Sequence, residues 1–355
     1  MWGKYDASKE TLSPFPGQPS VSPRLSGFGL DAIRNLDPSV DVWPVYDYLS
    51  YFDAIIEYLE SQGWVPGYNL FGVPWDWRQS QCWPPTMSRM KDTILEAKQA
   101  SGRNVTLISH SMGSLVVKCF IATYPDIFEN TVDAWISIAA PFKGAGAKIF
   151  MEFLQGYNLG NIVIGSEDAK GLSLESPAVY ELLPYLDFPW KQQPPFIAIS
   201  LNGKRQVYDS NGASGSYYDE LLRNALAKHR ITPPGNFFSS PEPFNEACWN
   251  LSLATRARVS AVALPAKIRF YNAYGVQQGT PVGLEFGPLA SWDELQTAKY
   301  VALLADGDGT VSAESAAAHG LGKTVGTLTV AADHMGIMTH PDTLRFVLDA
   351  LYDRI

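Results

Sequence analysis

The chain reads VTLISHSMGSLVVKCFIAT over residues 105–123, and this stretch indicates how the polypeptide folds. Residues 105–109 are mostly apolar and β-branched, which is typical of a buried strand. Residues 115–123 predict a helix that ends before Pro125, because the residue preceding a proline is forced out of the helical region. The stretch therefore predicts a strand, a tight turn and a helix in direct succession.

The turn carries the pentad Ser109-His110-Ser111-Met112-Gly113. A serine at the centre of such a turn has a strained backbone, so the residues two before and two after it must be small. Gly113 is small on one side, and Ser109 replaces the usual glycine on the other. In this context the pentad predicts a nucleophile elbow with Ser111 as the nucleophile. A helix N-cap serine is the alternative that the pentad by itself leaves open.

Strands and helices alternate on both sides of the elbow, which is typical of a parallel sheet covered by helices. Strands are expected at 69–73, 105–109, 134–140, 268–274, 300–304 and 325–330, and helices at 46–60, 87–101, 115–123 and 343–352. The first 45 residues are expected to be mostly irregular. Between about 143 and 265 the alternation stops, in a segment too long for an ordinary connection. We therefore expect an α/β core formed by residues 1–142 and 266–355, with residues 143–265 inserted as a cap or lid.

A serine nucleophile needs a base and an acid that orients the base, and in an α/β-hydrolase fold they follow in the order Ser, Asp or Glu, His. Residues 306–311 read DGDGTV and follow the apolar run 300–304, which places a carboxylate on a loop leaving a strand. Asp308 is the expected acid. A Gly-rich turn with two solvated aspartates remains an alternative, whereas one short acidic run supplies too few ligands for calcium.

The five histidines differ in their position along this pattern. His334 lies between the expected strand 325–330 and the final helix, so it is the expected base. His340, just before Pro341, is the less favoured candidate because it starts that helix. The other three histidines have positions that do not suit a base. They are His110 beside the nucleophile, His229 in the insertion and His319 after an alanine-rich helix.

The amino-acid composition indicates which classes of binding partner the protein is expected to have. The 355 residues are 46% hydrophobic and 18% charged, with a formal net charge of -9. An acidic chain without a basic stripe offers nothing to phosphate backbones, so no nucleic acid is expected as a partner. No run approaches the roughly 18 apolar residues that a membrane span needs, and the first residues lack the features of a secretory signal.

The chain has three cysteines, Cys82, Cys119 and Cys248, and no CxxC spacing. An odd and sparse set predicts reduced thiols rather than a disulfide framework or a zinc site. We therefore expect a cytoplasmic protein with no metal and no cofactor.

Several segments resemble the lecithin:cholesterol acyltransferase-like family, and the plant phospholipase A-type members resemble the chain most. The similar segments are LFGVPWDWR at 70–78, the elbow at 108–113, IAAPFKG at 138–144, FYNAYG at 270–275, and DGDGTV at 306–311 together with Asp333-His334. The resemblance covers nearly the whole chain. It implies an α/β-hydrolase fold, with Ser111 as nucleophile, Asp308 as acid and His334 as base.

The start of the chain departs from the family pattern. Family members begin with a strand and a Pro-Gly loop that donates one backbone N–H to the oxyanion hole. No such strand is expected here, and Pro16-Gly17 lacks the apolar strand that would precede the loop. Met112 N–H is the one expected oxyanion donor. The expected fold therefore lacks the first strand or strands and the oxyanion loop, which predicts a shortened chain that is a weak catalyst.

The residues and the resemblance together predict a lipid acyl-ester hydrolase or O-acyltransferase that works through an acyl-serine intermediate. The expected partner is a phospholipid or another lipid ester, reached by peripheral contact with a membrane. A lipid-binding protein of the same fold that has lost turnover is an alternative. An esterase or peptidase that acts on other substrates is a third reading, which the aromatic insertion disfavours.

Overall fold

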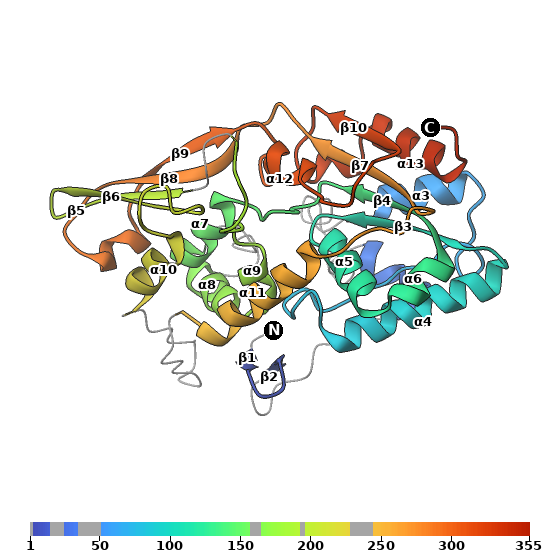
Figure 1. Ribbon diagram of the computed structural model, residues 1–355, viewed down its shortest axis with the longest axis horizontal. Helices are drawn as coiled ribbons and strands as arrows, with labels where there is room; N and C mark the ends of the chain where they lie inside the picture. The colour runs from blue at the N-terminus through green and yellow to red at the C-terminus, as the bar shows by residue number, and fades with distance from the viewer. Residues whose placement is uncertain (1–2, 15–24, 35–50, 157–164, 192–195, 228–243) are drawn as a thin grey trace.

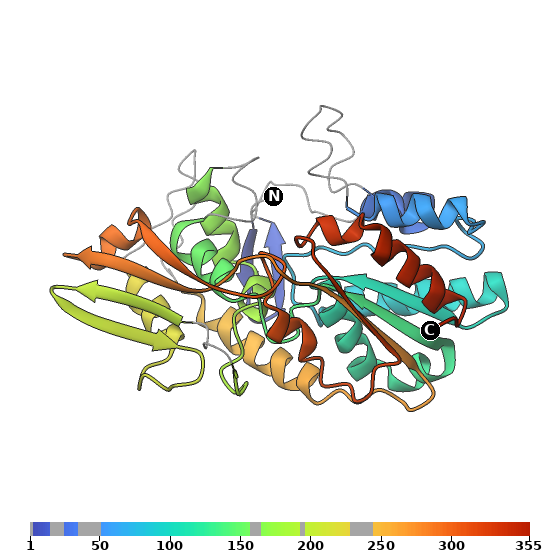
Figure 2. The ribbon, with the colours of Figure 1, turned by 90° about the horizontal axis from the view of Figure 1, so that it is seen from above.

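The computed structural model describes residues 3–14, 25–34, 51–156, 165–191, 196–227 and 244–355 (Figure 1). It has two parts side by side, each built on its own four-stranded sheet. Figure 2 shows the two parts from above, with the smaller sheet toward the left-hand end and the main sheet to its right.

The main sheet consists of four parallel strands in the order β10-β7-β4-β3. Their bounds are Val105–His110 for β3, Val132–Ile138 for β4, Arg269–Gly275 for β7 and Gly326–Val330 for β10. The predictions at 105–109, 134–140, 268–274 and 325–330 are confirmed, and the α/β class with them. Because the carboxyl ends of parallel strands meet at one edge, residues that follow β3 and β10 can form one site.

Helices cover both faces of the main sheet (Figure 1). On one face, α4 (Pro84–Ser101), α5 (Gly113–Thr123) and α6 (Pro125–Thr131) pack in a core with Trp135. On the other, α3 (Asp53–Ser61) and α13 (Pro341–Leu351) pack in a core with Ile136. Neighbouring residues of a strand point to opposite faces, so β4 contributes to both cores. The helices expected near 87–101, 115–123 and 343–352 are confirmed, whereas residues 46–50 of the fourth lie outside the described part of the chain.

The smaller sheet has the order β6-β5-β8-β9 and mixes strands from both sides of the predicted boundary at 265. Its strands are β5 (Phe196–Leu201), β6 (Lys204–Asp209), β8 (Thr280–Leu289) and β9 (Tyr300–Ala305). β5 pairs in parallel with β8, although β8 and β9 lie in the range expected in the core. The run 300–304 therefore forms a strand of the smaller sheet and not of the main one. Hydrophobic alternation predicts that a strand exists but does not identify its partner.

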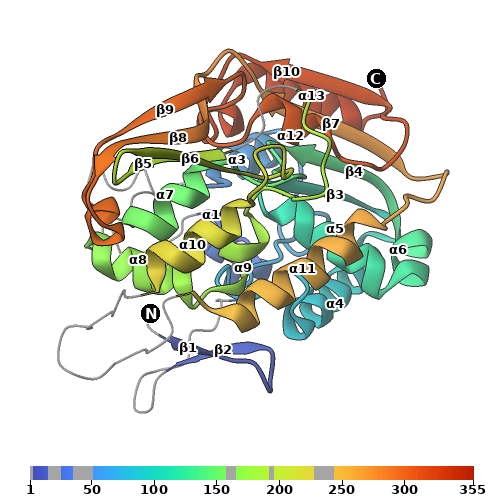
Figure 3. The same ribbon diagram turned by 60° about the vertical axis from the view of Figure 1, so that its left-hand side comes forward.

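Five helices pack under the smaller sheet and share one hydrophobic core with it (Figure 3). They are α7 (Ala147–Gln155), α8 (Ser166–Leu174), α9 (Pro177–Glu181), α10 (Tyr218–Leu226) and α11 (Glu246–Ser260). Shorter helices lie further along the chain, namely η2 (Trp292–Gln296), α12 (Ala313–Ala317) and η3 (Gly336–Met338). Among the helices that the structure describes, none is long and apolar enough to cross a membrane.

The first residues form a hairpin instead of the irregular chain that the sequence predicts. β1 (Gly3–Asp6) pairs antiparallel with β2 (Thr11–Pro14) in a sheet of their own. Tyr5 and Leu12 are buried in the core of the smaller part, which fixes the hairpin there and not beside β3. The short turns η1 (Ser26–Gly29) and α1 (Asp31–Arg34) follow.

The predicted strand at 69–73 is wrong. Only an isolated bridge between Pro66 and Leu70 forms in this region. Gly72 instead donates its N–H to the Phe28 carbonyl oxygen at 2.9 Å. A Cβ on Gly29 would lie 2.2 Å from the Gly72 carbonyl oxygen, so the two segments approach at a distance that only glycines allow. This packing against η1 replaces a sheet ladder.

The prediction of reduced thiols is wrong for two of the three cysteines. Cys82 and Cys119 form a disulfide, with 37 residues of sequence separation, and Cys248 is free and buried. Cys82 lies just before α4, and Cys119 lies on α5, against which α4 packs. Packing of two helices brought the pair together, and cysteine counting does not detect that.

Candidate active site

Ser111 lies on the turn between β3 and α5, as the pentad predicts. Its backbone is left-handed, with φ 52, which a residue other than glycine adopts only when the surrounding structure holds it there. A Cβ at Gly113 would lie 3.2 Å from the Trp75 ring, so a larger residue would meet that ring. The elbow geometry therefore depends on Gly113 and presents Ser111 at the carboxyl edge of the main sheet.

Ser109, the residue at the position where glycine is usual, is part of a buried hydrogen-bond chain behind the elbow. Trp135 Nε1 donates to Ser109 Oγ at 2.8 Å, and Ser109 Oγ lies 2.9 Å from Ser114 Oγ. Ser114 Oγ in turn lies 2.9 Å from Ser137 Oγ on β4. These bonds connect the elbow to the neighbouring strand β4. They also give hydrogen-bond partners to the buried serine hydroxyl groups, including that of Ser109, which stands where glycine is usual.

The three side chains expected to act together form one hydrogen-bonded chain. Ser111 Oγ lies 2.9 Å from His334 Nε2, and His334 Nδ1 lies 2.7 Å from Asp308 Oδ2. They come from the turn after β3, the loop after β9 and the loop after β10. Both separations are within hydrogen-bond range for a nucleophile, a base and the group that orients the base.

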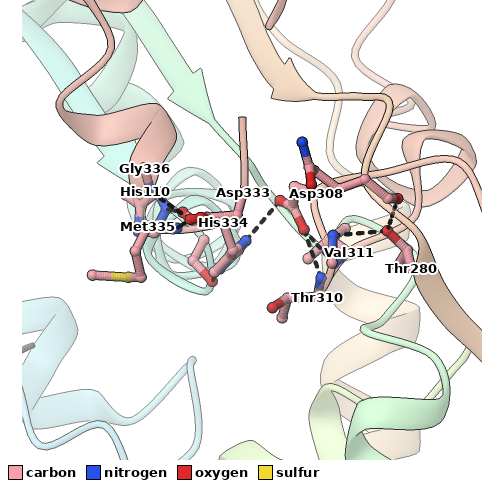
Figure 4. Close-up of polar contacts among 12 residues, drawn as sticks. His110, Thr280, Asp308, Thr310, Val311, Asp333, His334, Met335 and Gly336 are labelled. Atoms are coloured by element: carbon pink, nitrogen blue, oxygen red, sulfur yellow. Dashed lines mark hydrogen bonds and ion pairs between the residues drawn. The ribbon is translucent and has the colours of Figure 1, made fainter. Parts of the chain in front are cut away.

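The Asp308 carboxylate is held in place by its own loop. Its side chain is 1% exposed, and its Oδ1 accepts from the Thr310 N–H at 2.9 Å and the Val311 N–H at 2.7 Å. These two backbone donors satisfy one oxygen of the buried carboxyl group and fix its orientation. The other oxygen, Oδ2, is thereby directed to His334 (Figure 4).

The other histidine candidates for the base lie outside this hydrogen-bonded chain, whereas the expected oxyanion donor lies at the elbow. His340 Nδ1 accepts from the Asp342 N–H at the start of α13, which is the helix-start position predicted for it. His319 packs its ring against Phe142 and Phe270. His229 lies outside the described residues. Met112 is the residue immediately before α5, so its N–H lies at the amino end of that helix.

Sequence reasoning set His110 aside, yet its ring lies against the ring of His334, with centroids 4.8 Å apart. His110 Nε2 lies 2.9 Å from the His334 carbonyl oxygen, and its Nδ1 lies 2.7 Å from Tyr51 Oη. The position of His110 directly before the nucleophile is the sequence signal that could have identified it as part of the site. Within the described ranges, no group of three or more His, Cys, Asp or Glu side chains could hold a metal ion.

Comparisons with known proteins show which family the chain resembles. A family model described as lecithin:cholesterol acyltransferase matches residues 6–218. The phospholipase A(1) LCAT3 of Arabidopsis thaliana is 32% identical, covering 95% of this chain and 78% of the relative. The human lysosomal phospholipase A and acyltransferase is 27% identical, covering 61% of this chain and 52% of the relative. A solved chain of the Tle4-Tli4 complex has a TM-score of 0.58 at 14% identity, covering 92% of this chain and 79% of that chain, and shows a shared fold.

Proposed function

Because the chain belongs to the lecithin:cholesterol acyltransferase family, we propose that it cleaves the acyl ester of a phospholipid or related lipid through an acyl-serine intermediate. Relatives are named phospholipase A(1) and phospholipase A and acyltransferase. Lipid acyl-ester hydrolysis or transfer is the enzyme activity that this membership supports. The hydrogen-bonded chain from Ser111 through His334 to Asp308 is the observation that carries the proposal of residue roles.

In the proposed mechanism, Ser111 Oγ attacks the ester carbonyl carbon while His334 Nε2 accepts its proton. The 2.9 Å separation of these two atoms suits direct proton transfer. Asp308 accepts from His334 Nδ1–H at 2.7 Å, which keeps Nε2 unprotonated in the resting state and stabilises the imidazolium that forms. His334 then returns the proton to the departing alcohol oxygen, and the acyl group remains on Ser111.

The former carbonyl oxygen becomes negatively charged in the tetrahedral intermediate and needs backbone donors. We assign the Met112 N–H to this role, because it lies at the amino end of α5, where the helix dipole also favours negative charge. A second donor is usual, and removing one donor typically slows the reaction about 100-fold to 1,000-fold. The contacts of the described residues assign no second donor, so the prediction of a weak catalyst stays a prediction.

In deacylation a second nucleophile attacks the acyl carbon, and the Ser111 oxygen is the leaving group. Water gives hydrolysis, and an alcohol gives acyl transfer. His334 accepts the proton of whichever molecule attacks and returns it to Ser111. The smaller part beside the sheet controls the choice, in this proposal, through how well it excludes water from the acyl-serine.

Labelling with a fluorophosphonate probe tests the proposal. We expect the probe to label the wild-type chain and to leave Ser111→Ala unlabelled, and phosphatidylcholine vesicles to be hydrolysed by the first chain only. Binding of the vesicles without labelling or turnover would favour the alternative of a lipid-binding protein. Hydrolysis of short esters and peptides but not of the vesicles would favour the non-lipid esterase.

A further inference from the structure

We infer that His110 and Tyr51 together position His334 for proton transfer, an inference that rests on the proposed function. His110 is 2% exposed and directly precedes Ser111. Its two ring nitrogens have different partners, the His334 carbonyl oxygen at 2.9 Å from Nε2 and Tyr51 Oη at 2.7 Å from Nδ1. His110 is therefore the link between the nucleophile's strand and the loop that carries the base.

The partners determine which nitrogen of His110 carries the proton. A carbonyl oxygen only accepts hydrogen bonds, so Nε2 must be the protonated nitrogen. Burial, together with the neighbouring His334, lowers the pKa of His110 well below its ordinary value, so the ring is neutral and Nδ1 is an acceptor. Burial also raises the pKa of Tyr51, which keeps its hydroxyl a donor. The donors thus run in one direction, from Tyr51 O–H to Nδ1 and from Nε2–H to the carbonyl oxygen.

This arrangement holds the main chain of His334 on both sides. Its N–H donates to the Asp308 carbonyl oxygen at 2.9 Å, and its carbonyl oxygen accepts from His110. The base is thus attached through its N–H to the acid's residue and through its carbonyl to the residue beside the nucleophile. Because a misplacement of about 1 Å can slow a reaction about 100-fold, this second attachment should matter for the rate and not for substrate binding.

The neutral state of His110 matters for a second reason. Its ring centroid lies 4.8 Å from that of His334, which becomes an imidazolium when it accepts the Ser111 proton. A charged ring at this distance would oppose that proton transfer. Among the residues that the structure describes, Tyr51 and His334 are the ionisable groups that contact His110, and neither brings a negative charge that would favour protonation of His110.

Three substitutions separate these contributions. His110→Leu removes both hydrogen bonds, His110→Gln keeps an amide donor for the His334 carbonyl, and Tyr51→Phe removes the donor to Nδ1 alone. For a short soluble ester we expect kcat to fall about 10-fold to 100-fold in His110→Leu with KM within about twofold of wild type. His110→Gln should recover most of that loss, and Tyr51→Phe should lose only a few-fold. His319→Leu is the matched control, a histidine outside the triad's contacts, and should keep its kcat.

The rate of fluorophosphonate labelling should fall in parallel with kcat, because the probe also needs His334 to activate Ser111. Since Tyr51 acts through His110, Tyr51→Phe should have no further effect when added to His110→Leu. Unchanged kcat in His110→Leu and His110→Gln, with normal labelling of the wild type, would overturn this inference alone. Failure of the wild type to be labelled would overturn the proposed function and this inference with it. If His110→Leu does not fold, the inference is still overturned by an undiminished wild-type kcat in both Tyr51→Phe and the double variant Tyr51→Phe/His110→Gln.

Discussion

Ser111, His334 and Asp308 lie far apart in sequence, and backbone hydrogen bonds hold each of them. Ser111 N–H donates to the Ile138 carbonyl oxygen, His334 N–H donates to the Asp308 carbonyl oxygen, and Asp308 Oδ1 accepts from the Val311 N–H. We predict that Ser111→Ala, Asp308→Asn and His334→Ala each reduce ester hydrolysis by about 10⁴-fold, because every member is needed for one proton transfer. Double variants should lose little more than single ones, since the three act as a unit. Steady-state hydrolysis of one ester by each variant measures this.

His340→Ala is the control for that series, because His340 contacts the start of α13 and not Ser111. Thermal melts should show that the folded state survives in all variants. A variant of His334 that keeps its activity while His340→Ala loses it would show that the base had been misassigned.

At the scale of elements, α9 is joined to the segment before α4 by a buried carboxyl. Glu181 Oε2 accepts from the Gln81 N–H at 2.8 Å, and Oε1 accepts from Ser80 Oγ. Burial raises the pKa of Glu181 to about 7, against the bonds from Gln81 and Ser80 and the nearby Arg256, which lower it. Below about pH 7 the neutral carboxyl is therefore the prevailing form of Glu181 in the folded chain.

This contact predicts a pH-dependent stability. The pKa in the folded chain is raised above the ordinary 4.5 to about 7, so the stabilisation is complete below about 4.5 and is lost as the pH rises through 7. The change amounts to about 3 kcal/mol at most, since each pKa unit corresponds to about 1.4 kcal/mol. Denaturant unfolding from pH 5 to 8 should show a decline in the wild type that Glu181→Gln lacks. If the free energy of unfolding changes with pH in the same way in both chains, Glu181 is not the group responsible for the decline.

The disulfide between Cys82 and Cys119 joins that same segment to the elbow helix α5. Closing a loop with 37 residues of separation restricts the unfolded chain, and the chain-entropy model gives a stabilisation of about 4 kcal/mol. We predict that the double variant Cys82→Ala/Cys119→Ala unfolds at lower denaturant concentration than the wild type. A reductant should shift the wild type toward the variant and leave the variant unchanged. Equal unfolding midpoints of the wild type with and without reductant would show that the disulfide does not stabilise the chain.

At the scale of the whole molecule, the smaller part lies beside the sheet that presents Ser111 (Figures 1 and 2). We predict that it acts as the cap that receives the acyl chain, and that β8 and β9 belong to this cap together with residues 143–265. The rate with a given acyl group should then be higher in micelles than in a short soluble ester, because an apolar inner face of this cap would favour the aggregated substrate. Assay of both forms at equal ester concentration measures the difference, and equal rates would remove the reason for a lipid-facing cap.

Local sequence patterns were enough to predict the strand, elbow and helix at 105–123, because apolar periodicity and the small residue Gly113 are local properties. They also led to Ser111, Asp308 and His334, through their order and their place after apolar runs. Their roles in catalysis remain predictions. Ser111 and His334 come within 2.9 Å of each other because β3 and β10 belong to one parallel sheet. Asp308 reaches His334 at 2.7 Å from the loop after β9, a strand of the smaller sheet, and forms a bridge with Gln278.

Features that depend on partners distant in sequence follow from tertiary packing and not from local patterns. β9 joins β8 and not the main sheet, residues 69–73 pack against η1, and Cys82 meets Cys119 where α4 packs on α5. The same holds for His110, whose two hydrogen bonds reach Tyr51 and His334. A local pattern specifies which residues are apolar, small or polar, but the contact that each one makes depends on how all the elements pack into one folded chain.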